Sequence, residues 1–350
     1  MDTMSATALD ERSRDVLKSL IQFHVSTGEP VGSESLSRAF NRALSPATIR
    51  SIMGELERRG YLDHPHTSAG RVPTDEGYRV YVDSLMSQEP LPSREAATIS
   101  KHLRVRDGSA QQVLQDASHV LSRLSHHVAF ALAPDISGTV FHHVDFVRLT
   151  HPRILVVMVS RTGLVTSKLI EMEEDISQDQ LQACANYLNS EFAGMSLVAI
   201  RARLMEVMRE EKALYDSLLK QVVSVGERAF SADDEGGRVY LDGTSNILDQ
   251  PEFEDLDRMR ALFKTFEEKS RLVKILNAYL AGSGIRITIG HENPDPELKD
   301  LALVTASCAV DGQRLGVGIM GSTRMEYGRM ISLVDHVARA VSRALEDIRA

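Results

Sequence analysis

The chain has 350 residues, of which 43% are hydrophobic and 25% charged, a composition typical of globular proteins with two or three domains. Its net charge of −9 argues against indiscriminate binding to nucleic acid or to an anionic membrane. The two cysteines, Cys184 and Cys308, have neither disulfide nor zinc spacing, and no apolar run reaches the ~18 residues of a membrane span. We therefore expect a soluble, cytoplasmic protein that needs no metal or cofactor.

The first ninety residues predict a small helical unit that contains one hairpin. Helical spacing of apolar residues indicates helices over 10–27 and 33–40, and Ser45 followed by Pro46 is a strong start signal for a third helix. A further helix is expected over 74–87, and the segment 61–74 before it is typical of a β-hairpin. This order of elements predicts a winged helix-turn-helix.

The third helix has the two faces that DNA recognition requires. One face is apolar, and the opposite face is small, polar and basic, although the whole chain is acidic. Small side chains allow close approach to a groove, while hydroxyl and guanidinium groups reach base edges or phosphates. Gly70 is expected at the hairpin tip. The predicted DNA contacts are Ser45, Thr48, Arg50, Ser51 and Arg58 on the helix, and His66, Ser68 and Arg71 on the hairpin.

The rest of the chain predicts an α+β domain that is interrupted by helices. After a linker at 88–93 and an amphipathic helix over 113–128, strands are expected within 139–172. The pattern is helical over 177–230, and strands return from 238 onward. A block of helices inside a run of strands is typical of an insertion, so we expect the strands near 139–170 to pair with strands beyond 236.

An enzymatic function finds little support in the sequence. Gly316, Gly318 and Gly321 match the G-x-G-x-x-G pattern of dinucleotide sites, but they lie inside the second arm of a predicted hairpin rather than between a strand and a helix. The structural alternative is that they let another backbone pack closely on the strand. A serine in "GTSNI", residues 243–247, has neither a nucleophile elbow nor an identifiable base. We predict no catalytic activity.

Long motifs resemble the HrcA family of heat-inducible transcription repressors. The resemblance covers "SPATIRSIMGELERRGYLDHPHTSAGRVPTDEGYRVYVDSLM" from Ser45, "LDGTSNILDQPEF" (241–253), "IGHEN" (289–293) and "GSTRMEYGRMISLV" (321–334). The family usually has Pro at the position of Ser322, a small departure from its pattern. The helices over 177–230 match the family in their hydrophobic pattern rather than in sequence motifs, so the resemblance defines their boundaries and role less closely than those of the other segments.

The resemblance implies a repressor of chaperonin and DnaK-type chaperone operons. It would bind double-stranded DNA at an inverted-repeat (CIRCE) operator as a homodimer, and the GroE chaperonin would maintain its activity. The implied domains are a winged helix over 1–90, a GAF-like α/β domain over 94–176 and 234–350, and a helical dimerisation insertion over 177–233. The apolar stripe expected to carry the dimer contact includes Leu204, Met208, Leu214, Leu218 and Val222.

The sequence leaves two alternatives open, one for the dimer contact and one for the GAF-like domain. The insertion stripe can pack within its own protomer, in which case the C-terminal helix becomes the next candidate for the dimer contact. The GAF-like domain can also serve as a sensor of a small-molecule effector, although the chain has no Trp and few aromatic residues to build a stacking pocket.

Overall fold

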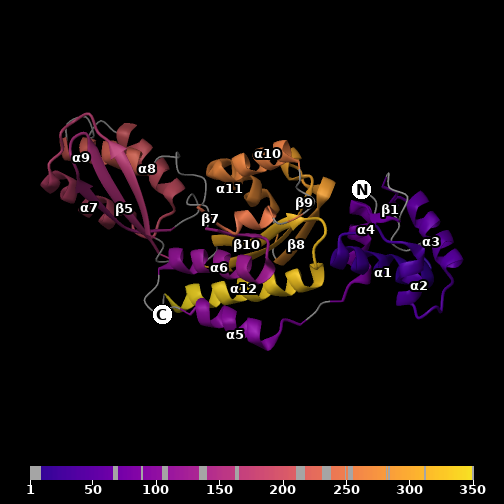
Figure 1. Ribbon diagram of the computed structural model, residues 1–350. Coiled ribbons are helices and arrows are strands. Elements are labelled where there is room, and N and C mark those ends of the chain that lie inside the picture. Colours follow the sequence, from indigo (N-terminus) through magenta and orange to yellow (C-terminus); the bar gives the residue numbers. More distant parts are fainter. Residues whose placement is uncertain are drawn as a thin grey trace.

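The chain is a mixed α/β protein that consists of a helical N-terminal unit, a central five-stranded sheet and a separate three-stranded sheet (Figure 1). The computed structural model describes residues 9–65, 70–87, 90–104, 109–133, 140–161, 165–209, 217–230, 238–248, 250, 255–280, 282, 284–310 and 313–348. Within these residues, no helix has the length and hydropathy that a membrane span requires.

The N-terminal unit follows the predicted order of elements. Helix α1 ends at Gly28, whose φ of 76° is the left-handed conformation in which glycine commonly ends a helix. The strands β1 and β2 pair antiparallel as the base of the predicted hairpin, and α4 continues as one π-helical turn, η2. The elements are α1 (Glu11–Thr27), α2 (Ser33–Ala39), α3 (Pro46–Arg58), β1 (Leu62–Asp63), β2 (Val72–Pro73), α4 (Asp75–Val80) and η2 (Tyr81–Leu85).

The central sheet is antiparallel, with the strand order β7-β3-β10-β9-β8. Its strands are β3 (Val128–Leu132), β7 (Val239–Asp242), β8 (Gly284–Ile289), β9 (Leu301–Val310) and β10 (Gln313–Ser322). Side chains alternate between its faces: Ala129 and Ala131 join one hydrophobic core, while Val128 and Phe130 join another. Both faces are therefore covered by helices.

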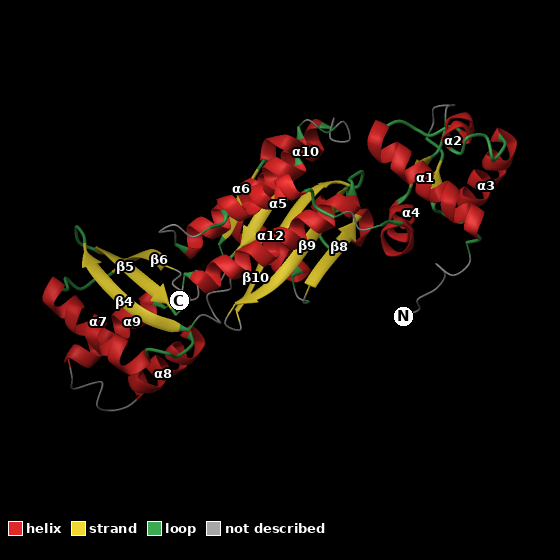
Figure 2. Cartoon of the chain, turned by 90° about the horizontal axis from the view of Figure 1, so that it is seen from below, coloured by secondary structure: helices red, strands yellow, loops and turns green. Residues whose placement is uncertain are grey.

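The helices of the central unit lie in two layers (Figures 1 and 2). The first layer shares its core with the N-terminal unit and consists of α5 (Ser93–His102), α6 (Ala110–Ser125) and α12 (Tyr327–Asp347). The second layer consists of α10 (Leu256–Glu267) and α11 (Lys269–Tyr279). The buried stripe of α12 lies against the sheet.

The strands near 139–170 form a sheet of their own, so the predicted pairing with strands beyond 236 is wrong. Strands β4, β5 and β6 pair antiparallel in chain order, and α7, α8 and α9 cover one face of the sheet. Short connections make this local pairing cheaper in chain entropy than pairing across the helical block. These elements are β4 (Phe141–Arg148), β5 (Arg153–Ser160), β6 (Val165–Glu171), α7 (Gln178–Phe192), α8 (Leu197–Arg209) and α9 (Ser217–Ala229).

The three glycines of the G-x-G-x-x-G pattern lie in β10, in the middle of the central sheet. A Cβ at Gly316 would meet the side chain of Leu280, and a Cβ at Gly318 would meet Phe130 and the carbonyl oxygen of Val304. Close approach of another backbone, as the sequence suggested, is found at Gly318, whereas the space at Gly316 is filled by the side chain of Leu280 at the end of α11. The glycines thus serve packing on and within the sheet.

The separate cores predict that the two sheets lose stability independently. Phe141 is fully buried against Phe230, with ring centroids 5.6 Å apart and nearly perpendicular, whereas Phe130 is fully buried under the central sheet. We expect Phe141→Ala to lower the unfolding free energy of the three-stranded sheet by about 3–5 kcal/mol and to leave β9 and β10 unaffected. Amide hydrogen exchange in β5 measures the stability of the three-stranded sheet, and exchange in β10 measures the stability of the central sheet. Phe130→Ala is the matched control, with the reverse pattern, and equal loss in both sheets would contradict the division.

Candidate nucleic-acid interface

Helix α3 is built so that one face is buried and the other is free. Ser45 caps it, because its Oγ accepts a hydrogen bond from the Thr48 backbone N–H at 3.1 Å, and Pro46 occupies the first helical position. Ile49, Met53 and Leu56 are buried against the rest of the N-terminal unit. The start signal and the apolar stripe that the sequence predicted are both confirmed.

The opposite face of α3 presents the predicted polar residues to solvent. Thr48, Arg50, Ser51 and Arg58 are exposed. The hydroxyl groups of Thr48 and Ser45 lie 2.9 Å apart, so they form one polar pair at the helix N-terminus. The Arg50 guanidinium lies 3.5 Å from Ser33 Oγ, a long contact that an incoming phosphate can readily replace.

Arg71 lies at the base of the hairpin and is held by α3. Its Nε donates to Glu57 Oε2 at 2.8 Å, and its Nη1 lies 2.8 Å from His64 Nδ1. The side chain is only 24% exposed. The guanidinium therefore ties the hairpin to α3, a role that the sequence did not suggest, and a DNA contact by Arg71 stays a prediction. His66 and Ser68 lie outside the described residues.

Gly70 is required by close approach of two backbones, and not by the tight tip that the sequence predicted for it. A Cβ at this position would lie 2.7 Å from the carbonyl carbon and oxygen of Val31. Val31 and Arg71 exchange two backbone hydrogen bonds, of 2.8 and 3.0 Å. The chain between α1 and α2 thus fixes the hairpin from one side, while Glu57 fixes it from the other.

The pairing of charges leaves an excess of exposed arginines around α3. Residues 32–72 contain six arginines and four acids. Two of these arginines neutralise two of the acids, in the pairs Arg59–Glu55 at 2.5 Å and Arg71–Glu57 at 2.8 Å. The remaining four arginines, all exposed, face only two remaining acids, and such a surface attracts a polyanion. The four are Arg38, Arg42, Arg50 and Arg58.

Two of the five residues predicted to carry the dimer contact are buried within the protomer. Leu204 and Val222 are only 1% and 0% exposed, because they lie in the core between α7, α8, α9 and the three-stranded sheet. This is the intramolecular packing that the sequence left open as an alternative. Leu214 lies outside the described residues, as do the side chains of Met208 and Leu218.

Among the described residues, the face of the three-stranded sheet opposite α7–α9 carries exposed apolar side chains. Cross-strand register places Leu155 between Val147 and Leu169, which are 44% and 49% exposed. One end of the same face holds Val159 beside Val165, which is 41% exposed. The row between these two pairs Val157 with the polar residues Asp145 and Ser167, so the face is mixed. Exposed apolar side chains gathered in this way are typical of interaction sites in globular proteins. We refer to this face as the open sheet face.

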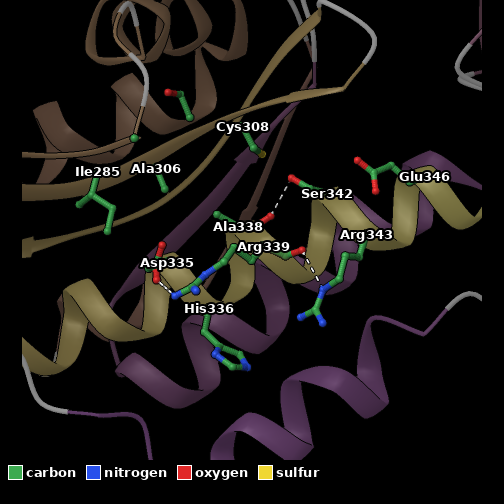
Figure 3. Close-up of a pocket in the computed structure, with 12 residues that line it drawn as sticks. Ile285, Ala306, Cys308, Asp335, His336, Ala338, Arg339, Ser342, Arg343 and Glu346 are labelled. Carbon is green, nitrogen blue, oxygen red and sulfur yellow. Dashed lines mark hydrogen bonds and ion pairs between the residues drawn. The ribbon is translucent and has the colours of Figure 1, made fainter.

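A cavity of about 530 Å³ opens between α12 and the strands β8 and β9 (Figure 3). Arg339 and Arg343 line it from α12, and Cys308 lines it from β9. Burial raises the pKa of the Cys308 thiol, so the thiol stays protonated near neutral pH. Among the described residues, no group of three or more His, Cys, Asp or Glu side chains is placed to hold a metal ion. Sensing of a small-molecule effector stays a prediction.

Comparison with known proteins identifies the relatives of the chain. Residues 111–331 match the family described as HrcA protein C terminal domain. The heat-inducible transcription repressor HrcA of Geobacter sulfurreducens is 42% identical over 341 residues, which cover 97% of this chain and 99% of the relative. The repressor of the same name from Xanthomonas euvesicatoria pv. vesicatoria is 39% identical over 347 residues, 99% of both chains. A crystal structure described as a hypothetical protein shares the fold, with a TM-score of 0.65 at 20% identity over 97% of this chain and 99% of that one.

Proposed function

The chain belongs to the HrcA family of heat-inducible transcription repressors, and on this premise we propose that it represses chaperonin and DnaK-type chaperone operons by binding an inverted-repeat CIRCE operator as a dimer. The observation that carries the proposal is the polar face of α3, where Thr48, Arg50, Ser51 and Arg58 are exposed while the opposite face is buried. In this proposal the N-terminal unit is a winged helix, with α3 as its recognition helix and the β1–β2 hairpin as its wing.

Substitution of the two exposed arginines tests the recognition helix. We expect Arg50→Ala and Arg58→Ala each to weaken operator binding without loss of fold, because neither side chain is part of the core. A phosphate contact lowers affinity for all sequences and reduces the salt slope by about one unit, whereas a base contact costs ~1–3 kcal/mol and relaxes specificity at one position. Fluorescence anisotropy at several salt concentrations distinguishes the two. Arg260→Ala on α10, which removes an exposed ion pair with Asp257, is the control. Unchanged affinity in both α3 variants would contradict the assignment.

We further propose that the dimer contact is the open sheet face, within an inserted unit that spans residues 140–230 instead of 177–233. The strands β4–β6 share one core with α7–α9, which supports placing them in the same unit. The remaining α/β unit is the GAF-like domain of this proposal. Two copies of the apolar row Val147, Leu155 and Leu169 can pack face to face and remove this surface from water.

A charge in the apolar row of the open sheet face tests the dimer proposal. We expect Leu169→Asp to raise the dimer dissociation constant about thirtyfold or more, because a contact of about 2 kcal/mol is lost and a carboxylate is desolvated. Sedimentation velocity across a range of concentrations measures the constant. Leu248→Asp is the matched control, because Leu248 is similarly exposed, at 54% against 49% for Leu169, but lies outside the sheet. A dimer that tolerates Leu169→Asp as well as the control would move the contact elsewhere, with α12 as the next candidate.

Dependence on the GroE chaperonin has a physical rationale in the central sheet. Strand β3 pairs with β7, for example Ala129 with Asp242, and with β10, for example Leu132 with Gly316. The whole three-stranded unit lies in the chain between β3 and β7. Non-local pairing of this kind is slow and leaves apolar strands exposed until it is complete. We propose that the chaperonin acts on this folding step, so that unfolded proteins competing for it during heat stress reduce the supply of active repressor.

Titration with operator DNA tests the role of the chaperonin. We expect purified protein to be partly active, and chaperonin with ATP to raise the stoichiometric binding capacity at a constant dissociation constant, because refolding adds active molecules without altering them. A tighter constant at constant capacity would instead indicate an allosteric corepressor. If neither quantity changes, direct thermal unfolding of the repressor becomes the better account.

A further inference from the structure

Two sequence motifs, over 289–293 and 321–334, are not part of the proposed DNA-contacting surface. Residues of both motifs lie against the N-terminal unit. His291 and Glu292 contact α4, and Arg324 and Tyr327 contact α1 and α4. Figure 1 shows the sheet end that carries β8 facing this unit. Segments more than 200 residues apart in sequence thus meet at one interface.

The first contact is a two-pronged ion pair between Arg79 on α4 and Glu292. Arg79 Nε donates to Glu292 Oε1 at 2.6 Å, and Nη2 donates to Glu292 Oε2. The same Nη2 donates to the Ile287 carbonyl oxygen of β8 at 2.9 Å. The hydrogen bonds to Glu292 raise the pKa of Arg79 further above its usual value. Because both charged groups are planar, this geometry fixes an orientation as well as a distance.

The second contact joins Asp75, the first residue of α4, to the turn at Gly290 and His291. Asp75 Oδ2 accepts a hydrogen bond from the His291 backbone N–H at 2.9 Å and lies 2.6 Å from His291 Nδ1. The hydrogen bond to Asp75 raises the pKa of His291. Gly290 has a φ of 53°, and a Cβ there would overlap the Asp75 carboxylate. The turn is therefore shaped to receive this one side chain.

The third contact is a buried pair of aromatic rings. Tyr78 of α4 and Tyr327 of α12 are almost fully buried, with ring centroids 6.0 Å apart. The fourth contact joins Arg324 to α1: Arg324 Nη1 donates to the Val25 carbonyl oxygen at 2.9 Å, near the C-terminal end of α1 where cations are stabilised. We call these four contacts together the α4 docking interface.

The docking interface connects rigidly to the recognition helix. Thr74 caps α4, and its backbone N–H also donates to the carbonyl oxygen of Tyr61, which lies between α3 and β1. Its hydroxyl donates to the Gly60 carbonyl oxygen at 2.5 Å. Because α4 and α3 are joined by these bonds, holding α4 against the sheet also fixes the direction of α3.

We propose that Asp75 and Arg79 are positioning residues, which set the angle at which α3 is presented to an operator through their contacts with His291 and Glu292. The inference rests on the proposed function. In a dimer, the second recognition helix binds at an effective concentration that is high only when its direction matches the second half-site. When the orientation of α3 is fixed, the dimer binds tightly to operators with one half-site spacing and weakly to operators with other spacings. When the orientation is loose, the dimer binds operators of every spacing with moderate affinity.

The test uses the full-length Asp75→Asn/Arg79→Gln variant and three DNA duplexes. The duplexes carry a single half-site, two half-sites at the operator's own spacing, and two half-sites with about 5 bp inserted, roughly half a helical turn. We expect single half-site affinity to stay within about twofold of wild type. Affinity for the operator's own spacing falls about tenfold, and discrimination against the insertion falls by a similar factor. Arg79→Lys, which keeps the charge without the two-pronged geometry, falls between wild type and the double variant.

Arg260→Gln is the control for loss of an exposed arginine ion pair outside the interface, and it leaves all three affinities unchanged. The inference is overturned if the double variant keeps wild-type discrimination between the two spacings. It is also overturned if affinity for the single half-site falls as much as affinity for the operator, because the DNA-binding unit itself is then damaged. Wild-type protein that binds none of the three duplexes refutes the proposed function itself.

Discussion

The pairing of β3 with both β7 and β10 is the constraint on which the rest of the structure depends. It places Ala129 beside Asp242 and Leu132 beside Gly316, so the chain between β3 and β7 must leave the central sheet and return to it. That excursion carries a complete sheet and helix unit with its own core. The same pairing completes the sheet face that α12 covers, and α12 in turn delivers Tyr327 to the N-terminal unit.

The two ends of the molecule differ in how they use apolar surface. The N-terminal unit shares one continuous core with α5, α6 and α12, so its attachment combines burial with charged contacts. The three-stranded unit keeps a separate core and leaves one sheet face uncovered. An uncovered apolar face is expected where a second copy of the chain completes the burial. The core arrangement thus distinguishes a unit that shares its core with the body from a unit with a core of its own.

Charge pairing also determines which arginines remain available for DNA. Arg59 and Arg71 are engaged by glutamates of α3, and Arg79 by Glu292, whereas Arg50 and Arg58 stand on the exposed face. An acidic chain can therefore present a basic surface in one place, because the nearby glutamates are paired with Arg59, Arg71 and Arg79 and leave Arg50 and Arg58 exposed. Such a local positive charge attracts a polyanion to α3, while the net negative charge of the chain opposes non-specific binding to nucleic acid elsewhere on its surface.

The sequence by itself determined the features that depend on near neighbours in the chain. Ser45 with Pro46 marked the start of α3, and the apolar period of the helix defined its buried face, because caps and helical periods act within a few residues. Long sequence motifs indicated the family. Only the tertiary structure decided which strands pair, that Leu204 and Val222 are buried within the protomer, that Arg71 binds Glu57, and that Asp75 meets His291 across 216 residues. Alternation along a strand shows that one face is buried, but the partner is chosen by the free energy of the whole chain, in which chain entropy and burial compete over long separations.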